Sequence, residues 1–192
     1  MMPLRFCAKR RTFFAAFLAA VAIAASSCTD SVETLYATIR AFFRYDNVTA
    51  SHQLYTALNN PGEFCTVTIR NSVIYFTDAD GKTSQANLSA TEAYGKTQCV
   101  AGFVVGTPSV ADLNGQNQPR AYDLVCPTCY EQNSIQRSLQ FDGREQMKCP
   151  RCGRTYSLQT GLQTGGEEGV SVLYRYRMTY SSNASGTLVI NN

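Results

Sequence analysis

Four cysteines in two closely spaced pairs are the residues whose types and spacing point to definite chemistry. They form two C-x-x-C motifs, Cys126-Pro-Thr-Cys129 and Cys149-Pro-Arg-Cys152, with nineteen residues between them. Two cysteines three positions apart on a turn direct both sulfurs at one ion, and this separation of the pairs is typical of four-thiolate sites. The sequence therefore predicts one metal ion held by all four cysteines.

The residues around each pair favour tight metal-binding turns. A proline follows the first cysteine of both motifs and presets the turn. Gly153 follows the second motif and tolerates backbone angles that a side chain opposes, whereas Tyr130 stands at the matching place in the first. The second turn is therefore expected to be the better formed of the two.

Four thiolates suit zinc best, and they also suit a single iron or an all-cysteine iron–sulfur cluster. If zinc is bound, protein fills every coordination position and the site is structural. If iron is bound, the site can carry one electron to a docking redox partner. Spacing alone leaves these alternatives open, with zinc preferred.

Other chemistries find less support in the sequence. Neither C-x-x-C pair is expected to open a helix and no βαβ pattern surrounds them, so a thioredoxin-like enzyme is not expected. His52 is the only histidine. We expect it to be a surface residue, and no Ser-His-Asp set or phosphate-binding glycine loop accompanies it. The protein is therefore expected not to be an enzyme.

The first 27 residues have the features of a secretory leader. A basic head, with Lys9, Arg10 and Arg11, precedes an apolar stretch from Phe13 to Ala25 that is too short to span a bilayer. The small residues before Cys28 are similar to a bacterial lipobox, in which the cysteine is acylated. We therefore expect a signal peptide at 1–27, a lipidated Cys28 with a tether to residue 32, and a lipid anchor in the bacterial cell envelope.

Removing the leader changes the charge balance and the cysteine inventory. The chain has 17 Lys and Arg against 14 Asp and Glu, but four basic residues lie in the leader. The remainder is close to neutral and gives no indication of nucleic-acid binding. Outside the cytoplasm, the two cysteines left over, Cys65 and Cys99, are expected to form a disulfide.

The pattern of the remaining chain predicts a mainly β fold for residues 33–192. One short helix is expected at 49–58, where apolar residues recur at helical spacing before an Asn-Asn-Pro-Gly turn. Alternating or β-branched runs predict short strands over the second half of 33–45, then 64–70, 72–77, 98–106, 122–125, 138–141, 156–158, 170–180 and 187–190.

The segment from Tyr122 to Asn191 resembles the Rieske iron–sulfur domain in the order of its motifs. Asp123-Leu-Val-Cys126-Pro is similar to the strand entering the family's first metal loop, and Cys149-Pro-x-Cys152-Gly followed by Tyr156 is similar to the second loop. The resemblance implies an antiparallel β-sandwich with a small metal-binding subdomain. A Rieske centre uses two Cys and two His, whereas Thr128 and Cys152 occupy the histidine positions here. The expectation is thus a Rieske-like scaffold carrying a four-cysteine site of zinc-ribbon or rubredoxin type.

Overall fold

Antiparallel strands dominate the computed structural model, which describes residues 35–89, 97–167 and 169–192. An eight-stranded sheet has the order β1-β12-β11-β6-β5-β2-β3-β4, and every neighbouring pair in it is antiparallel. Its strands are β1 (Phe42–Tyr45), β2 (Glu63–Arg70), β3 (Val73–Asp78), β4 (Thr83–Asn87), β5 (Phe103–Thr107), β6 (Arg120–Asp123), β11 (Arg175–Ser181) and β12 (Thr187–Asn191). The mainly β prediction is confirmed.

The large sheet curls until distant strands face each other. Tyr45 lies on the edge strand β1 and Phe76 on β3, six strand intervals along the sheet. A flat sheet would separate them by about 29 Å, yet their ring centroids are 5.1 Å apart. Phe43 on β1 likewise lies 5.7 Å from Phe103 on β5. The sheet therefore encloses its core between two facing halves, as a β-sandwich does.

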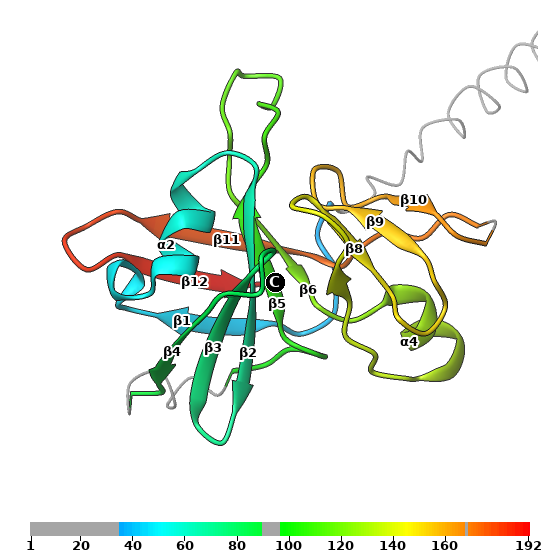
Figure 1. Cartoon of the computed structure of the whole chain (residues 1–192), viewed down its shortest axis with the longest axis horizontal. Helices are drawn as coiled ribbons and strands as arrows, with labels where there is room; N and C mark the ends of the chain where they lie inside the picture. The colour runs from blue at the N-terminus through cyan, green and yellow to red at the C-terminus, as the bar shows by residue number, and fades with distance from the viewer. Residues whose placement is uncertain (1–34, 90–96, 168) are drawn as a thin grey trace, which may run out of the picture. The chain divides into compact units, whose positions relative to one another are not determined.

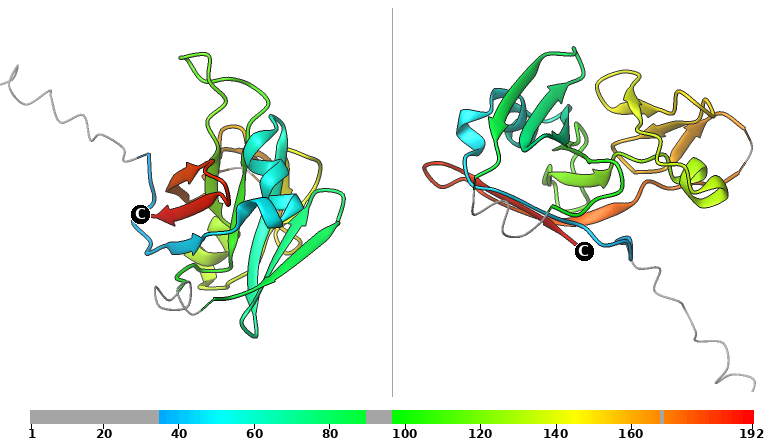
Figure 2. Two further views of the ribbon diagram at one scale, coloured as in Figure 1. Left: turned by 90° about the vertical axis from the view of Figure 1, so that its left-hand side faces the viewer. Right: turned by 90° about the horizontal axis from the view of Figure 1, so that it is seen from below.

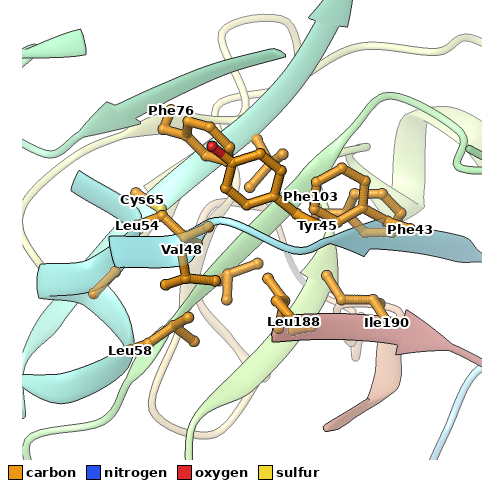
Figure 3. Close-up of a cluster of buried hydrophobic side chains, with 14 of the residues drawn as sticks. Phe43, Tyr45, Val48, Leu54, Leu58, Cys65, Phe76, Phe103, Leu188 and Ile190 are labelled. Carbon is orange, nitrogen blue, oxygen red and sulfur yellow. The ribbon is translucent and has the colours of Figure 1, made fainter. Parts of the chain in front are cut away.

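The enclosed core is aromatic and aliphatic (Figure 3). Short helix α2 (His52–Asn59) follows the 3₁₀ turn η1 (Val48–Ala50) and covers one end of this core with its buried Leu54, Ala57 and Leu58. His52 lies on the exposed side of α2, as expected for a surface residue. The helix predicted at 49–58 is thus confirmed at nearly the same position.

A second, four-stranded sheet is inserted into the large one. It has the order β10-β9-β8-β7 and consists of β7 (Gln140–Phe141), β8 (Gln146–Lys148), β9 (Thr155–Ser157) and β10 (Gln163–Gly165). The insertion leaves the large sheet after β6 and returns at β11, which pairs with β6 through Arg175 and Tyr122. Both ends of the small sheet are therefore anchored on neighbouring strands. Figures 1 and 2 show it beside the large sheet, together with helix α4 (Pro127–Asn133).

Most predicted strands exist, with boundaries shifted by a few residues. The sequence pattern missed three strands, β4, β8 and β10, all of them short and polar. It also missed α4, because Cys126-Pro127 was interpreted as a turn. In fact Cys126 caps a helix with Pro127 in its first turn, and Ser134 ends it in the left-handed conformation.

The predicted bond between Cys65 and Cys99 is wrong, since both are free thiols. Cys65 lies in the core on β2 and pairs with Val105, whereas Cys99 precedes β5 by four residues and is exposed. Cys99 lies six positions before Val105, outside the strand that pairs with β2.

The leader and the acylation site lie outside the described residues, so the signal peptide, Cys28 and the tether stay predictions. Residues 35–192 group into one compact unit. Within the described part, no helix has the length and apolar character required to cross a membrane.

Candidate metal centre

The four predicted cysteines come together where the small sheet meets α4. Their sulfur atoms all lie within 4.8 Å of one another. The sulfurs of Cys126 and Cys152 are 3.7 Å apart, and those of Cys129 and Cys149 are also 3.7 Å apart. Each of these two contacts joins one cysteine from the first motif with one from the second, so the two motifs interlock.

These distances fit a tetrahedral ion. A zinc–sulfur bond of about 2.3 Å places neighbouring sulfurs of a tetrahedron about 3.8 Å apart. A disulfide needs sulfurs about 2.05 Å apart, and all four cysteines are free thiols. The set therefore has the donor chemistry and the spacing to hold one ion.

The first motif is positioned by α4. The N–H of Cys126 donates to the carbonyl of Arg137 (2.8 Å), and the N–H of Ile135 donates to the carbonyl of Cys129 (3.2 Å). The segment that follows α4 therefore runs back along the helix and forms hydrogen bonds with both cysteines of the motif. Cys126 and Cys129 are placed one helical turn apart and direct their sulfurs to the same side.

The second motif forms the turn between β8 and β9. The N–H of Cys149 donates to the carbonyl of Arg154 (2.9 Å), and the N–H of Gly153 donates to the carbonyl of Cys149 (3.0 Å). Gly153 has a φ of +73°, in the left-handed region. A side chain would strain the backbone there, which confirms the role predicted for this glycine.

Three cysteines of the site are fully buried and belong to a hydrophobic cluster. Cys126, Cys129 and Cys149 are packed with apolar residues from both sheets, including Val104, Tyr122, Leu124, Met147, Tyr156, Leu158 and Leu173. Cys152 is only partly buried. The site is therefore integrated into a second core and opens toward solvent on the side of Cys152.

The protein environment shifts the pKa values of the thiols in different directions. Burial raises the pKa of Cys126, and burial also raises the pKa of Cys129 to about 11. Burial opposes ionisation of Cys152 as well, but hydrogen bonds from Arg154 and the neighbouring thiols lower its pKa to about 7. Cys152 thus ionises more easily than Cys126 and Cys129 when no metal is bound.

Two groups near the sulfurs were not identified from the sequence. Arg154 is buried and pairs with Glu167 at 3.2 Å, and its positive charge next to Cys152 offsets thiolate charge. Tyr156 lies with its hydroxyl 3.7 Å from the Cys126 sulfur and 3.2 Å from the Thr128 hydroxyl. Tyr156 is the aromatic residue that follows the second motif in the resemblance above, but its contact with the Cys126 sulfur and the position of Arg154 arise only from packing.

The thioredoxin-like alternative finds no support in this geometry, although the first motif does open a helix. The sulfur of Cys126 lies 3.7 Å from that of Cys152, in the other motif. The raised pKa of Cys126 is the opposite of the lowered pKa that an attacking thiol at a helix start requires.

No family model matches this sequence, and no curated protein matches it.

Proposed function

We propose that this protein is an exported, lipid-anchored bacterial protein whose Rieske-like domain binds one structural zinc ion through four cysteines and acts as an interaction module. The supporting observation is the approach of all four sulfurs to within 4.8 Å of one another. Zinc, when bound, would cross-link the two motifs. This chain's own residues supply every ligand.

A complete set of four thiolates favours a structural over a catalytic role. Catalytic zinc sites keep one position for water or substrate, whereas structural sites are closed by protein ligands. Here Cys126, Cys129, Cys149 and Cys152 fill a tetrahedron. No position remains at which a water could be activated, so we propose no enzymatic activity.

The uniform closeness of the sulfurs favours a single ion over an iron–sulfur cluster. In a two-iron cluster each pair of cysteines ligates a different iron, so the two pairs lie further apart than the cysteines within a pair. In this site all four sulfurs lie within 4.8 Å of one another, and two contacts of 3.7 Å join cysteines from different motifs. A mononuclear centre accounts for this arrangement directly.

The topology supports a Rieske-like scaffold. Strand β6 leads into the first metal motif, the β8–β9 turn carries the second, and β11 and β12 close the large sheet. The sequence resemblance over Tyr122–Asn191 implies this order of parts, with a small metal-bearing sheet inserted in a larger antiparallel one. On such a scaffold, a site of four cysteines would bind a structural metal ion in place of the family's redox cluster.

The leader supports the cellular location. Acylation of Cys28 would tether the domain to a membrane of the cell envelope, where the module would meet other surface proteins. Labelling with a radioactive fatty acid in cells, compared between the native chain and Cys28→Ala, tests this part alone. Label on the native chain and none on the variant is expected, and unlabelled native chain would refute the anchor.

A second candidate is electron transfer by a single iron in the same site. Cys152 is less buried than the other three cysteines and accepts hydrogen bonds from Arg154. Exposure and hydrogen bonds to sulfur are the factors that tune the potential of such a centre. A redox partner would then dock on the side of Cys152.

Metal analysis of the chain from Thr29 onward, purified without added metal, separates the two candidates. We expect about one zinc per chain in a colourless sample. A coloured sample whose visible absorption bleaches on reduction would refute the structural role and establish the iron centre. A sample with neither metal would refute both.

A further inference from the structure

Two arginines line a pocket that the metal site does not use, and a third lies over the tyrosine at its edge. Arg120 begins β6 and Arg175 begins β11, and both line a cavity of about 340 Å³ together with Tyr36. Arg177 reaches the same tyrosine, with its guanidinium 5.3 Å from the ring centroid, and the guanidinium of Arg175 lies 5.6 Å from it. We call this region the arginine pocket.

In the part of the chain that the structure describes, no ion pair neutralises the positive charge of the arginine pocket. Among residues 35–89, 97–167 and 169–192, none of the three arginines forms an ion pair with a carboxylate. Asp112 is the only acidic residue lining the cavity. Its Oδ1 accepts the N–H groups of Asn114 (2.9 Å) and Gln116 (3.0 Å) and so holds its own loop together.

Such an arrangement costs free energy unless an anion is near. Guanidinium groups stay protonated at any physiological pH, so the positive charges of Arg175 and Arg177, which both lie over the Tyr36 ring, repel each other. Arg120 donates through Nη1 to the carbonyl of Gln159. Its Nε is buried without a hydrogen-bond acceptor in the described part of the chain. Forked guanidinium donors bind phosphate and carboxylate oxygens better than any other anion-binding side chain.

Exposed leucines lie next to the arginine pocket in the sequence. Leu35 precedes Tyr36 and is 62% exposed, and Leu113 follows Asp112 and is fully exposed. Leu113 sits in the loop between β5 and β6, which projects from the body of the domain (Figure 1). Basic residues beside exposed apolar side chains are typical of surfaces that lie on anionic membranes.

The length of the predicted tether also indicates an anionic membrane as the partner. Tyr36 follows Cys28 by only eight residues, which span at most about 29 Å when fully extended. If Cys28 carries the lipid anchor of the proposed function, the arginine pocket is held close to the headgroups of that membrane. We propose that Arg175 and Arg177 bind the phosphate group of an anionic phospholipid, which orients the domain on the membrane.

Vesicle co-sedimentation tests this inference on the chain from Thr29, which contains the whole compact unit and lacks the acylated cysteine. We expect binding to vesicles of phosphatidylcholine and phosphatidylglycerol in equal parts, and none to phosphatidylcholine alone. The double variant R175Q/R177Q should bind about thirtyfold more weakly, since each basic residue near an anionic surface contributes roughly a fivefold factor. The control R70Q/R137Q removes the same charge from exposed arginines elsewhere and should bind normally.

Three results would overturn the inference. They are equal binding to both kinds of vesicle, equal loss in the two double variants, and release of the bound protein by inorganic phosphate at the salt concentration of the assay. The last result would assign the pocket to a soluble phosphate. Zinc content, measured on the same samples, keeps this test separate from the proposed function. A zinc-loaded protein that ignores anionic vesicles refutes only the lipid inference, and a zinc-free protein that binds them refutes only the metal site.

Discussion

The sulfurs of Cys126 and Cys152 lie 3.7 Å apart although the two residues are 26 positions apart in the chain. Cys126 immediately precedes α4, and Cys152 lies in the turn between β8 and β9. An ion bound here would therefore join two segments that are distant in sequence. The stability of the small sheet should depend on that ion.

Replacing Cys149 by serine should remove the ion and destabilise the domain. A hydroxyl is a poor zinc ligand, and loss of a structural metal is one of the changes with large effects on folding. We expect a loss of about 3 to 5 kcal/mol, or roughly 10 °C in melting temperature. Calorimetry with metal analysis measures both effects. The matched control is Cys99→Ser, at an exposed thiol outside the site. Equal melting temperatures for the two variants would contradict a structural ion.

Gly153 provides a test of the second metal turn. Its φ of +73° lies in the left-handed region, where most residues with a side chain are strained. A Cβ at this position would nevertheless meet no atom within 4 Å. Gly153→Val should cost about 1 to 2 kcal/mol through the backbone alone, or about tenfold in zinc affinity. Gly153→Asn should lose much less, because asparagine tolerates this conformation. Competition titration with a zinc chelator compares the two. Equal zinc affinity in both variants would show that the left-handed conformation at residue 153 does not contribute to metal binding.

The Asp123 carboxylate should stabilise the large sheet independently of the metal. It is buried and accepts the N–H groups of Val100 (2.9 Å), Ala101 (3.2 Å) and Val125 (2.8 Å), and the hydroxyl of Tyr176 (3.0 Å). In Asp123→Asn an amide donor replaces one acceptor oxygen and leaves N–H groups unpaired.

We expect Asp123→Asn to lower the free energy of unfolding by about 2 to 4 kcal/mol, measured by denaturant titration, with unchanged zinc content. Asp142→Asn, at an exposed position, is the control. If both variants unfold alike, the network around Asp123 contributes nothing.

These residues also show what could be predicted from the sequence. The cysteine ligands could be predicted, because two C-x-x-C motifs indicate the ligands and their local geometry. The strands could be predicted where apolar and polar side chains alternate. The partners of Asp123 could not, since its donors lie up to 53 positions away. The arginine pocket could not either, because the pairing of β6 with β11 brings Arg120 and Arg175 together, and a hydrogen bond from the Ala37 N–H to the Arg175 carbonyl places Tyr36 beside them.

The errors have equally local causes. Helix α4 was missed because Pro127 suits both a turn and the first turn of a helix. The bond between Cys65 and Cys99 was inferred by counting cysteines, which carries no information on the register that places Cys65 opposite Val105.

Acid should release the metal. Thiolates, not thiols, bind the ion, so protons compete with it and zinc affinity falls as pH falls. The raised pKa values of Cys126 and Cys129 without metal mean that the ion must displace their protons on binding. Zinc affinity measured by chelator competition should therefore decrease steadily from pH 8 to pH 5. A constant affinity over this range would indicate that thiolates are not the ligands.

X-ray absorption spectroscopy at the edge of the bound metal tests the central claim most directly, because it reports the ligand atoms around the ion. The account predicts four sulfur neighbours at about 2.3 Å and no nitrogen or oxygen in the first shell. Fewer than four sulfurs, or a protein that binds no metal and carries disulfides between these cysteines, would contradict it.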